Sequence, residues 1–202
     1  YREVTVRLLT DAQALKDDIL DGLDWVRKAV TQHDVGIVFL AGHGVNDADG
    51  TYYYLPVQAD HDRLLRTGVR LTDIQTTLAS MPGKALFFVD TCHAGSVMGR
   101  RGTIDLTRLI NELSSAESGA VVFAASTGRQ FSLEDERWQN GAFTKALLEG
   151  LSGNADYQKD GVITIKELDL YISERVKELT QGKQSPTTTV PKTIPDFPVV
   201  MY

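Results

Sequence analysis

Cysteine is almost absent from this sequence, and other features that would define a protein class are missing too. The single cysteine, Cys92, rules out an internal disulfide and fits a reducing compartment, so we expect a cytoplasmic protein. No Cys/His spacing typical of zinc and no phosphate-binding glycine loop occurs. No run of about 18 apolar residues exists, so we expect no membrane span. The net charge of −6 argues against nucleic acid as a partner.

What is present is a regular alternation of two patterns. Apolar runs typical of strands alternate with segments that carry one apolar face at helical spacing. This alternation predicts an α/β domain with a mostly parallel sheet and helices on both faces. The expected strands cover residues 4–9, 35–41, 51–55, 85–89 and 119–125, the expected helices cover 15–31, 72–80, 104–113, 143–151 and 165–179, and the expected loops cover 58–69, 95–104 and 128–140, with an extended tail from residue 184.

The lone cysteine follows one of these apolar runs. Residues 85–89 predict a buried central strand, and Cys92 comes just past its expected carboxyl end. Ligands of open α/β sheets bind in the crevice beyond such strand ends. The strand over residues 35–41 has the same form and leads into His43. If the two strands are parallel neighbours, His43 faces Cys92 across one crevice, which is the arrangement that a cysteine nucleophile and its base require.

His43 is the best placed of the four histidines to act as that base. It lies between two glycines, so its backbone is free to turn. His93 is adjacent to Cys92, and neighbouring side chains diverge. Ala94 and Gly95 would allow a tight turn after Cys92, and we expect backbone N–H groups, with those of Gly44 and Cys92 as candidates, to supply an oxyanion hole. The alternative is that Cys92 is an inert buried thiol and His43 a turn residue.

Two motifs carry a resemblance to a known family. Phe-Leu-Ala-Gly-His-Gly at 39–44 and Asp-Thr-Cys-His-Ala-Gly at 90–95 resemble the caspase-like cysteine peptidases (peptidase family C14, clan CD), in particular the bacterial metacaspase and orthocaspase branch. His43 and Cys92 are 49 positions apart, close to the roughly 50 typical of caspases. Weaker similarity continues through 125–128, 141–144 and 196–198.

The resemblance implies a fold and a reaction. The fold would be a three-layer αβα sandwich with a mostly parallel central sheet, formed by residues 1–202 as one caspase-like peptidase domain. The reaction would be peptide-bond hydrolysis through a thioester acyl-enzyme, with Cys92 as nucleophile and His43 as acid/base. No cofactor would be required. The alternatives are a catalytically silent caspase-like scaffold module and a clan relative with another cleavage preference.

The resemblance also implies a substrate preference. In metacaspases the aspartate at the position of Asp90 binds the arginine or lysine on the amino side of the cut bond. We therefore expect peptide and protein substrates cut after Arg, then Lys, with Ser126 and Glu134 as further pocket candidates. The alternatives are that Asp90 caps nearby backbone amides and that Glu134 belongs to a solvated charge run.

The family's usual first strand and helix have no counterpart before Val4. We therefore expect this chain to be part of a longer protein with further domains, and a sheet that lacks this strand would expose an edge. Arg100 and Arg101 lie in a glycine-rich segment, 96–104, that follows Cys92. This segment is either a self-cleavage loop or an ordinary exposed loop.

One further motif resembles a calcium-binding EF-hand loop. Asp156, Asp160 and Glu167 fall at positions 1, 5 and 12 of that pattern. Gln158 at position 3 and the neighbouring positive charge of Lys159 depart from it. We favour the alternative that Thr164 and Glu167 form a capping box for the last helix. Calcium as an activator stays open.

Overall fold

The computed structural model describes residues 1–93, 119–126, 134–135 and 140–202. Within these residues, a central six-stranded sheet has the order β3-β2-β1-β4-β5-β9. Strands β1, β4 and β5 are parallel, whereas β2 and β9 run in the opposite direction. The strands are β1 (Val35–Asn46), β2 (Tyr52–Leu55), β3 (Val69–Arg70), β4 (Lys84–His93), β5 (Ala120–Ala124) and β9 (Thr187–Thr189).

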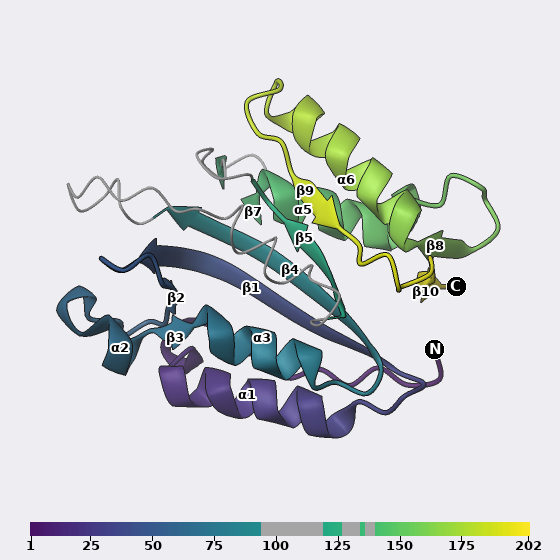
Figure 1. The fold of residues 1–202 in the computed structure, drawn as a ribbon. Helices are drawn as coiled ribbons and strands as arrows, with labels where there is room; N and C mark the ends of the chain where they lie inside the picture. The colour runs from purple at the N-terminus through teal and green to yellow at the C-terminus, as the bar shows by residue number, and fades with distance from the viewer. Residues whose placement is uncertain (94–118, 127–133, 136–139) are drawn as a thin grey trace.

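Helices cover both faces of this sheet (Figure 1). One face carries α1 (Lys16–Ala29) and α3 (Leu71–Ala79), and the other carries α5 (Ala142–Glu149) and α6 (Ile165–Leu179). The expected αβα sandwich with a mostly parallel sheet is confirmed. In the described part of the chain, none of the helices combines the length and hydropathy needed to cross a membrane.

Strand β4 shows why the sheet lies at the centre. Its side chains alternate between the two helical layers, as the period of two in a strand requires. Phe87 and Val89 join the core beside α1 and α3, whereas Leu86 and Phe88 join the core beside α5 and α6. The ring of Phe88 stacks on that of Phe123 in β5, with centroids 4.9 Å apart. A strand buried on both faces needs apolar residues at every position, which explains its continuous apolar run.

Several short elements complete the fold. Two small antiparallel sheets pair β6 (Glu134–Asp135) with β7 (Asn140–Gly141), and β8 (Val162–Thr164) with β10 (Pro198–Met201). A four-residue helix, α2 (Leu64–Thr67), two 3₁₀ turns, η1 (Asp11–Gln13) and η2 (His61–Arg63), and a π turn, η4 (Gly150–Asn154), lie between longer elements. The expected loop 58–69, loop 128–140 and extended tail therefore contain short elements that no periodic pattern reveals.

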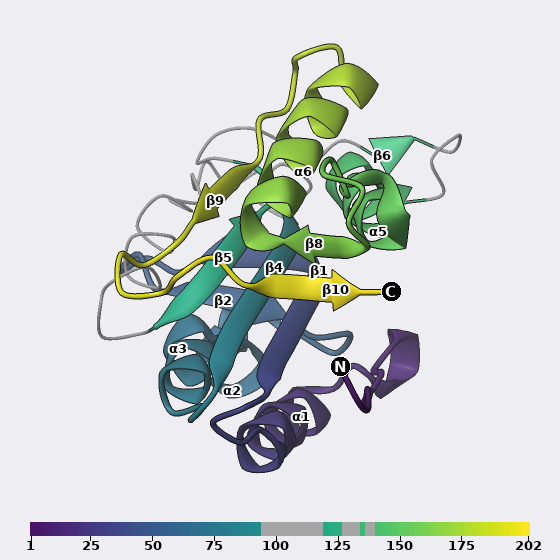
Figure 2. The ribbon, with the colours of Figure 1, turned by 90° about the vertical axis from the view of Figure 1, so that its right-hand side faces the viewer.

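The prediction of a strand over residues 4–9 is wrong. These residues are extended but unpaired, and Val4, Val6 and Leu8 are 80%, 75% and 73% exposed. Figure 2 shows this segment on the side of β1 away from β4. Strand β2 pairs with β1 only from His43 to Asn46, so in the described chain residues 35–42 have no partner on that edge. An extended segment without a partner strand forms no ladder.

Candidate active site

His43 and Cys92 occupy paired positions of adjacent parallel strands. Strand β1 pairs with β4 from Val35–Lys84 to Gly44–His93, and His43 is the direct partner of Cys92. Neighbouring strands lie about 4.8 Å apart, so the two backbone positions are next to each other. The expectation that these two residues meet at one end of the sheet agrees with this register.

The structure corrects one detail of that expectation. Both residues lie inside their strands rather than past the strand ends, because β1 continues to Asn46 and β4 to His93. Paired positions of parallel strands share a face of the sheet. Val38 and Leu40 of β1 pack toward α1 and α3, so the alternation puts His43 on the opposite face, where its side chain is exposed.

The sequence suggested that the glycines beside His43 allow a free turn, but both lie inside strand β1. They make room for two tyrosine rings of β2 on the other face of the sheet. A Cβ on Gly44 would lie 2.2 Å from Oη of Tyr52, and a Cβ on Gly42 would lie 3.0 Å from Oη of Tyr54. Gly42 also has a φ of +144°, which side chains rarely adopt. The Gly-His-Gly motif is therefore a packing requirement of strand β1.

Asp90 lies two residues before Cys92, on the same face of β4, and is only 7% exposed. The hydroxyl of Thr144, in the first turn of α5, donates a hydrogen bond to Asp90 Oδ2 at 2.6 Å. Gly141 adjoins the same oxygen, because a Cβ there would lie 2.9 Å from it. A buried carboxylate held at one oxygen is suited to bind a guanidinium or ammonium group.

The other two pocket candidates, Ser126 and Glu134, belong to segments that neighbour β4 and α5. Ser126 is the second residue after β5 and is 1% exposed, and the preceding residue, Ala125, donates its N–H to the carbonyl of Val89 at 2.9 Å. The backbone of Glu134 in β6 pairs with that of Gly141 in β7. This pairing brings Glu134 beside the glycine that borders Asp90, a relationship that sequence separation alone does not reveal.

Sequence reasoning missed Thr144 and the two tyrosines. Thr144 falls within a stretch that resembles the family, but nothing in its spacing links it to Asp90. Tyr52 donates a hydrogen bond to Thr91 Oγ1 at 3.1 Å, and Tyr54 donates one to the carbonyl of Ala41 at 2.8 Å. Burial raises the pKa of both phenols. The only sequence signal for these contacts was the run of three consecutive tyrosines in a short strand.

The EF-hand-like residues serve local structure. Thr164 and Glu167 form the expected capping box of α6, which is confirmed, and Glu167 also accepts the N–H of Gln158 at 3.4 Å. Asp156 accepts N–H groups of its own turn, including that of Gly161 at 3.0 Å. Asp160 accepts the N–H of Val162 at 2.9 Å. No three metal-ligating side chains converge anywhere in the described residues, so we derive no calcium chemistry.

The expected helix 104–113 and the segment 96–104, with Arg100 and Arg101, lie outside the described residues.

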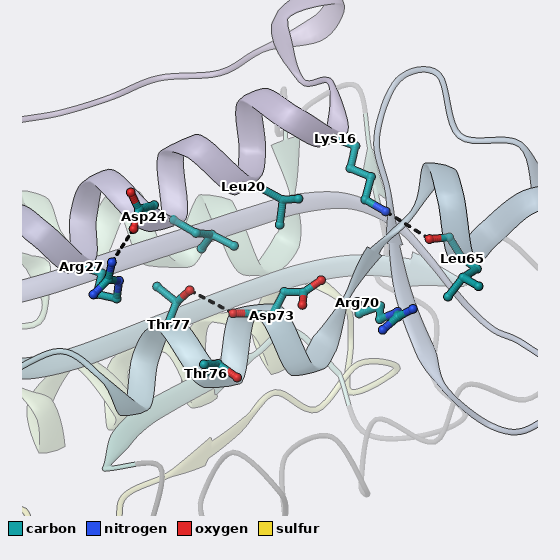
Figure 3. A pocket seen from close by; sticks show the side chains of 10 residues that line it. Lys16, Leu20, Asp24, Arg27, Leu65, Arg70, Asp73, Thr76 and Thr77 are labelled. Atoms are coloured by element: carbon teal, nitrogen blue, oxygen red, sulfur yellow. Dashed lines mark hydrogen bonds and ion pairs between the residues drawn. The ribbon is translucent and has the colours of Figure 1, made fainter.

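A hollow of about 350 Å³ lies between α1 and α3, on the face of the sheet opposite to His43 (Figure 3). Several of its polar groups bind neighbouring protein atoms. Lys16 Nζ donates to the carbonyl of Leu65 at 3.2 Å, and the Thr77 hydroxyl donates to that of Asp73 at 2.9 Å. Arg27 pairs with Asp24 at 2.5 Å. We assign no part of the site to this hollow.

Comparison with known proteins supports the assignment of the fold. The chain is similar to the crystal structure of protein GSU0716 from Geobacter sulfurreducens, with a TM-score of 0.65 and 16% identity over 93% of this chain and 77% of that chain. At this identity the likeness concerns the fold alone. No curated protein matches. The sequence profile of the caspase domain matches residues 3–197, nearly the whole chain. The protein therefore belongs to the caspase-domain family of peptidases.

Proposed function

We propose that this domain is a cysteine endopeptidase that cuts peptide bonds after basic residues, arginine before lysine. The observation that carries the proposal is the pairing of His43 with Cys92 in adjacent parallel strands, with Asp90 on the same face of β4. Membership of a peptidase family supports the same reading. Cys92 is the nucleophile, and His43 is the acid and base.

The reaction follows from these roles. His43 takes the proton of the Cys92 thiol, and the thiolate attacks the scissile carbonyl carbon. The resulting oxyanion accepts hydrogen bonds from the backbone N–H groups of Gly44 and Cys92. His43 then gives its proton to the departing amine, which leaves a thioester on Cys92. Water, deprotonated by His43, attacks the thioester, and the peptide acid and the thiol are released.

Asp90 sets the preference for a basic residue. Its carboxylate is buried and held at one oxygen by Thr144, so a cation that reaches it replaces water with a charge-assisted hydrogen bond. A guanidinium binds a carboxylate in a planar fork, which favours arginine over lysine. Ser126 and Glu134 complete the pocket in this proposal. An acidic side chain of the substrate would meet repulsion from Asp90.

Three further assignments extend the proposal. The domain belongs to the bacterial metacaspase and orthocaspase branch, since Asp-Thr-Cys-His-Ala-Gly follows that pattern. It acts in the cytoplasm as part of a longer polypeptide with additional domains.

Arg100 and Arg101 supply basic residues at which the enzyme cuts its own chain. Mass spectrometry of stored wild-type protein beside Cys92→Ala would test this. Two fragments in wild type alone are expected, and an intact chain in both would contradict self-cleavage.

The preference is tested with fluorogenic peptides that differ only in the residue before the cut, which is Arg, Lys or Asp. Each is offered to wild type and to Cys92→Ala, with and without calcium. The proposal predicts Cys92-dependent release from Arg, slower release from Lys and none from Asp. Release from Asp alone would overturn the basic pocket. No release from any peptide by folded protein would favour the scaffold alternative.

A further inference from the structure

We propose that Tyr52 and Tyr54 are positioning residues that hold the catalytic ends of β1 and β4 in register from the rear face of the sheet. The inference rests on the proposed roles of His43 and Cys92. It assigns a task to residues that lie on the face of the sheet opposite to His43. Their role is to fix the two backbone segments on which the dyad is carried.

Each tyrosine reaches one of the two segments. The Tyr52 hydroxyl donates to Oγ1 of Thr91, the residue immediately before Cys92, at 3.1 Å. The Tyr54 hydroxyl donates to the carbonyl of Ala41, two residues before His43, at 2.8 Å. Both donors come from the same four-residue strand. Strand β2 therefore links the segment that ends in the histidine to the segment that ends in the cysteine.

The location of these bonds explains why they are needed. In the described chain, β2 pairs with β1 only from His43 onward, so Ala41 lies where the outer edge of β1 has no strand partner. On the front face, Phe39 is 43% exposed, and His43 is also exposed. Among the residues that the structure describes, this end of β1 is packed more closely on the rear face, where both tyrosine rings are buried.

The glycines of the Gly-His-Gly motif are the counterpart of these rings. A Cβ at Gly44 would collide with the ring of Tyr52, and one at Gly42 would crowd that of Tyr54. The rings thus lie directly against the backbone on both sides of His43. Close packing of this kind transmits small shifts, and a displacement of about 1 Å between reacting groups costs about 100-fold in rate.

The test compares Tyr52→Phe and Tyr54→Phe with wild type, and uses Tyr53→Phe as the matched control. Tyr53 is a buried neighbour in β2, and its hydroxyl bonds neither Thr91 nor Ala41. Each variant removes one oxygen and keeps its ring. Steady-state kinetics on the arginine peptide give kcat and KM separately. Hydrogen exchange of peptides covering residues 39–46 and 84–93 measures how firmly the two strand ends are held, without any need for turnover.

The expected result is a loss of about tenfold in kcat for Tyr52→Phe and Tyr54→Phe, with KM unchanged and faster exchange in the two peptides. Tyr53→Phe should match wild type. Thr91→Val should lower kcat as much as Tyr52→Phe does. The double variant Tyr52→Phe/Thr91→Val should lower kcat no further, because both substitutions remove the same bond. A role in stability alone would lower the free energy of unfolding and leave kcat intact, which would overturn the inference.

The outcomes separate this inference from the proposed function. Unchanged exchange in Tyr52→Phe and Tyr54→Phe overturns the inference whatever the activity of wild type. If wild type has no turnover on any peptide, the proposed function fails. The catalytic part of the inference fails with it, and the exchange data alone then decide whether the tyrosines restrain the two strand ends.

Discussion

The hydroxyl of Thr144 donates a hydrogen bond of 2.6 Å to Oδ2 of Asp90. This bond joins the first turn of α5 to the carboxyl end of β4, two residues before Cys92. It fixes one oxygen of a carboxylate that is nine-tenths buried. The charge of Asp90 is therefore held in a defined direction, which a pocket for a basic side chain requires.

Replacing Asp90 tests the charge of the proposed pocket. Asp90→Asn keeps the shape and removes the charge, so kcat/KM for the arginine peptide should fall by about 100-fold, as expected when a charged hydrogen bond is lost. Alkylation of Cys92 by iodoacetamide should proceed at the wild-type rate, and it reads a single site because the chain has one cysteine. Wild-type turnover in this variant would remove Asp90 from the pocket.

Replacing Thr144 tests the orientation of that charge. Thr144→Val leaves Asp90 without its donor, so we expect a rise in KM for the arginine peptide of about tenfold, equivalent to one hydrogen bond to a charged group. Thr144→Ser retains the hydroxyl and serves as the control, with kinetics close to wild type. Equal KM values for the valine and serine variants would show that the bond does not orient the pocket.

The ion pair between Glu149 of α5 and Arg175 of α6 predicts a pH-dependent stability. Hydrogen bonds from Arg175 lower the pKa of Glu149 from 4.5 to about 2. A lowered carboxyl pKa stabilises the fold above the unfolded value, and the stabilisation is lost as the pH falls from 4.5 through about 2. Glu149→Gln should therefore lower the free energy of unfolding by about 1 kcal/mol at neutral pH and change it little at about pH 2.

Urea denaturation of wild type and Glu149→Gln at a series of pH values measures this difference. The two curves of unfolding free energy should converge at the acid end. A constant gap at every pH would show that packing of the side chain, and not its charge, stabilises the contact between α5 and α6.

Replacing Phe123 tests the core beside α5 and α6, on the face of the sheet that carries Asp90. The ring of Phe123 is fully buried and stacks on Phe88 of β4. Phe123→Ala should lower the free energy of unfolding by about 3–5 kcal/mol, because it removes apolar contacts and leaves a cavity. Leu170→Ala on α6 is the control: this leucine is 48% exposed, so its loss should change stability by less than about 0.5 kcal/mol. Denaturant unfolding of wild type and both variants measures these changes in stability.

The long elements were predictable from sequence because periodic burial specifies them. The helix expected over residues 165–179 matches α6, and the apolar run 85–89 lies inside β4. The segment 4–9 has a good strand pattern but forms no strand, since pairing requires a partner that a local pattern cannot supply. Strands β9 and β10 pair with distant strands over three or four residues, too few for any period to appear.

The site was predictable only in part, for a related reason. His43 and Cys92 end matching apolar runs, so parallel pairing suffices to bring them together. The Thr144–Asp90 bond spans 54 positions and the Tyr52–Thr91 bond spans 39. A threonine or a tyrosine can bond many residue types, so the sequence does not indicate which partner each one has. Such contacts depend on where α5 and β2 pack against the sheet, which follows from the assembled fold.

The most direct test of the His43–Cys92 pair is the pH dependence of Cys92 alkylation in wild type and His43→Ala. If His43 is the base of Cys92, wild type should react with iodoacetamide well below the ordinary cysteine pKa of about 8.5, and His43→Ala should move the profile up toward that value. Circular dichroism spectra confirm that both proteins are folded. Superimposable profiles would show that the two residues, although paired in the sheet, do not act together.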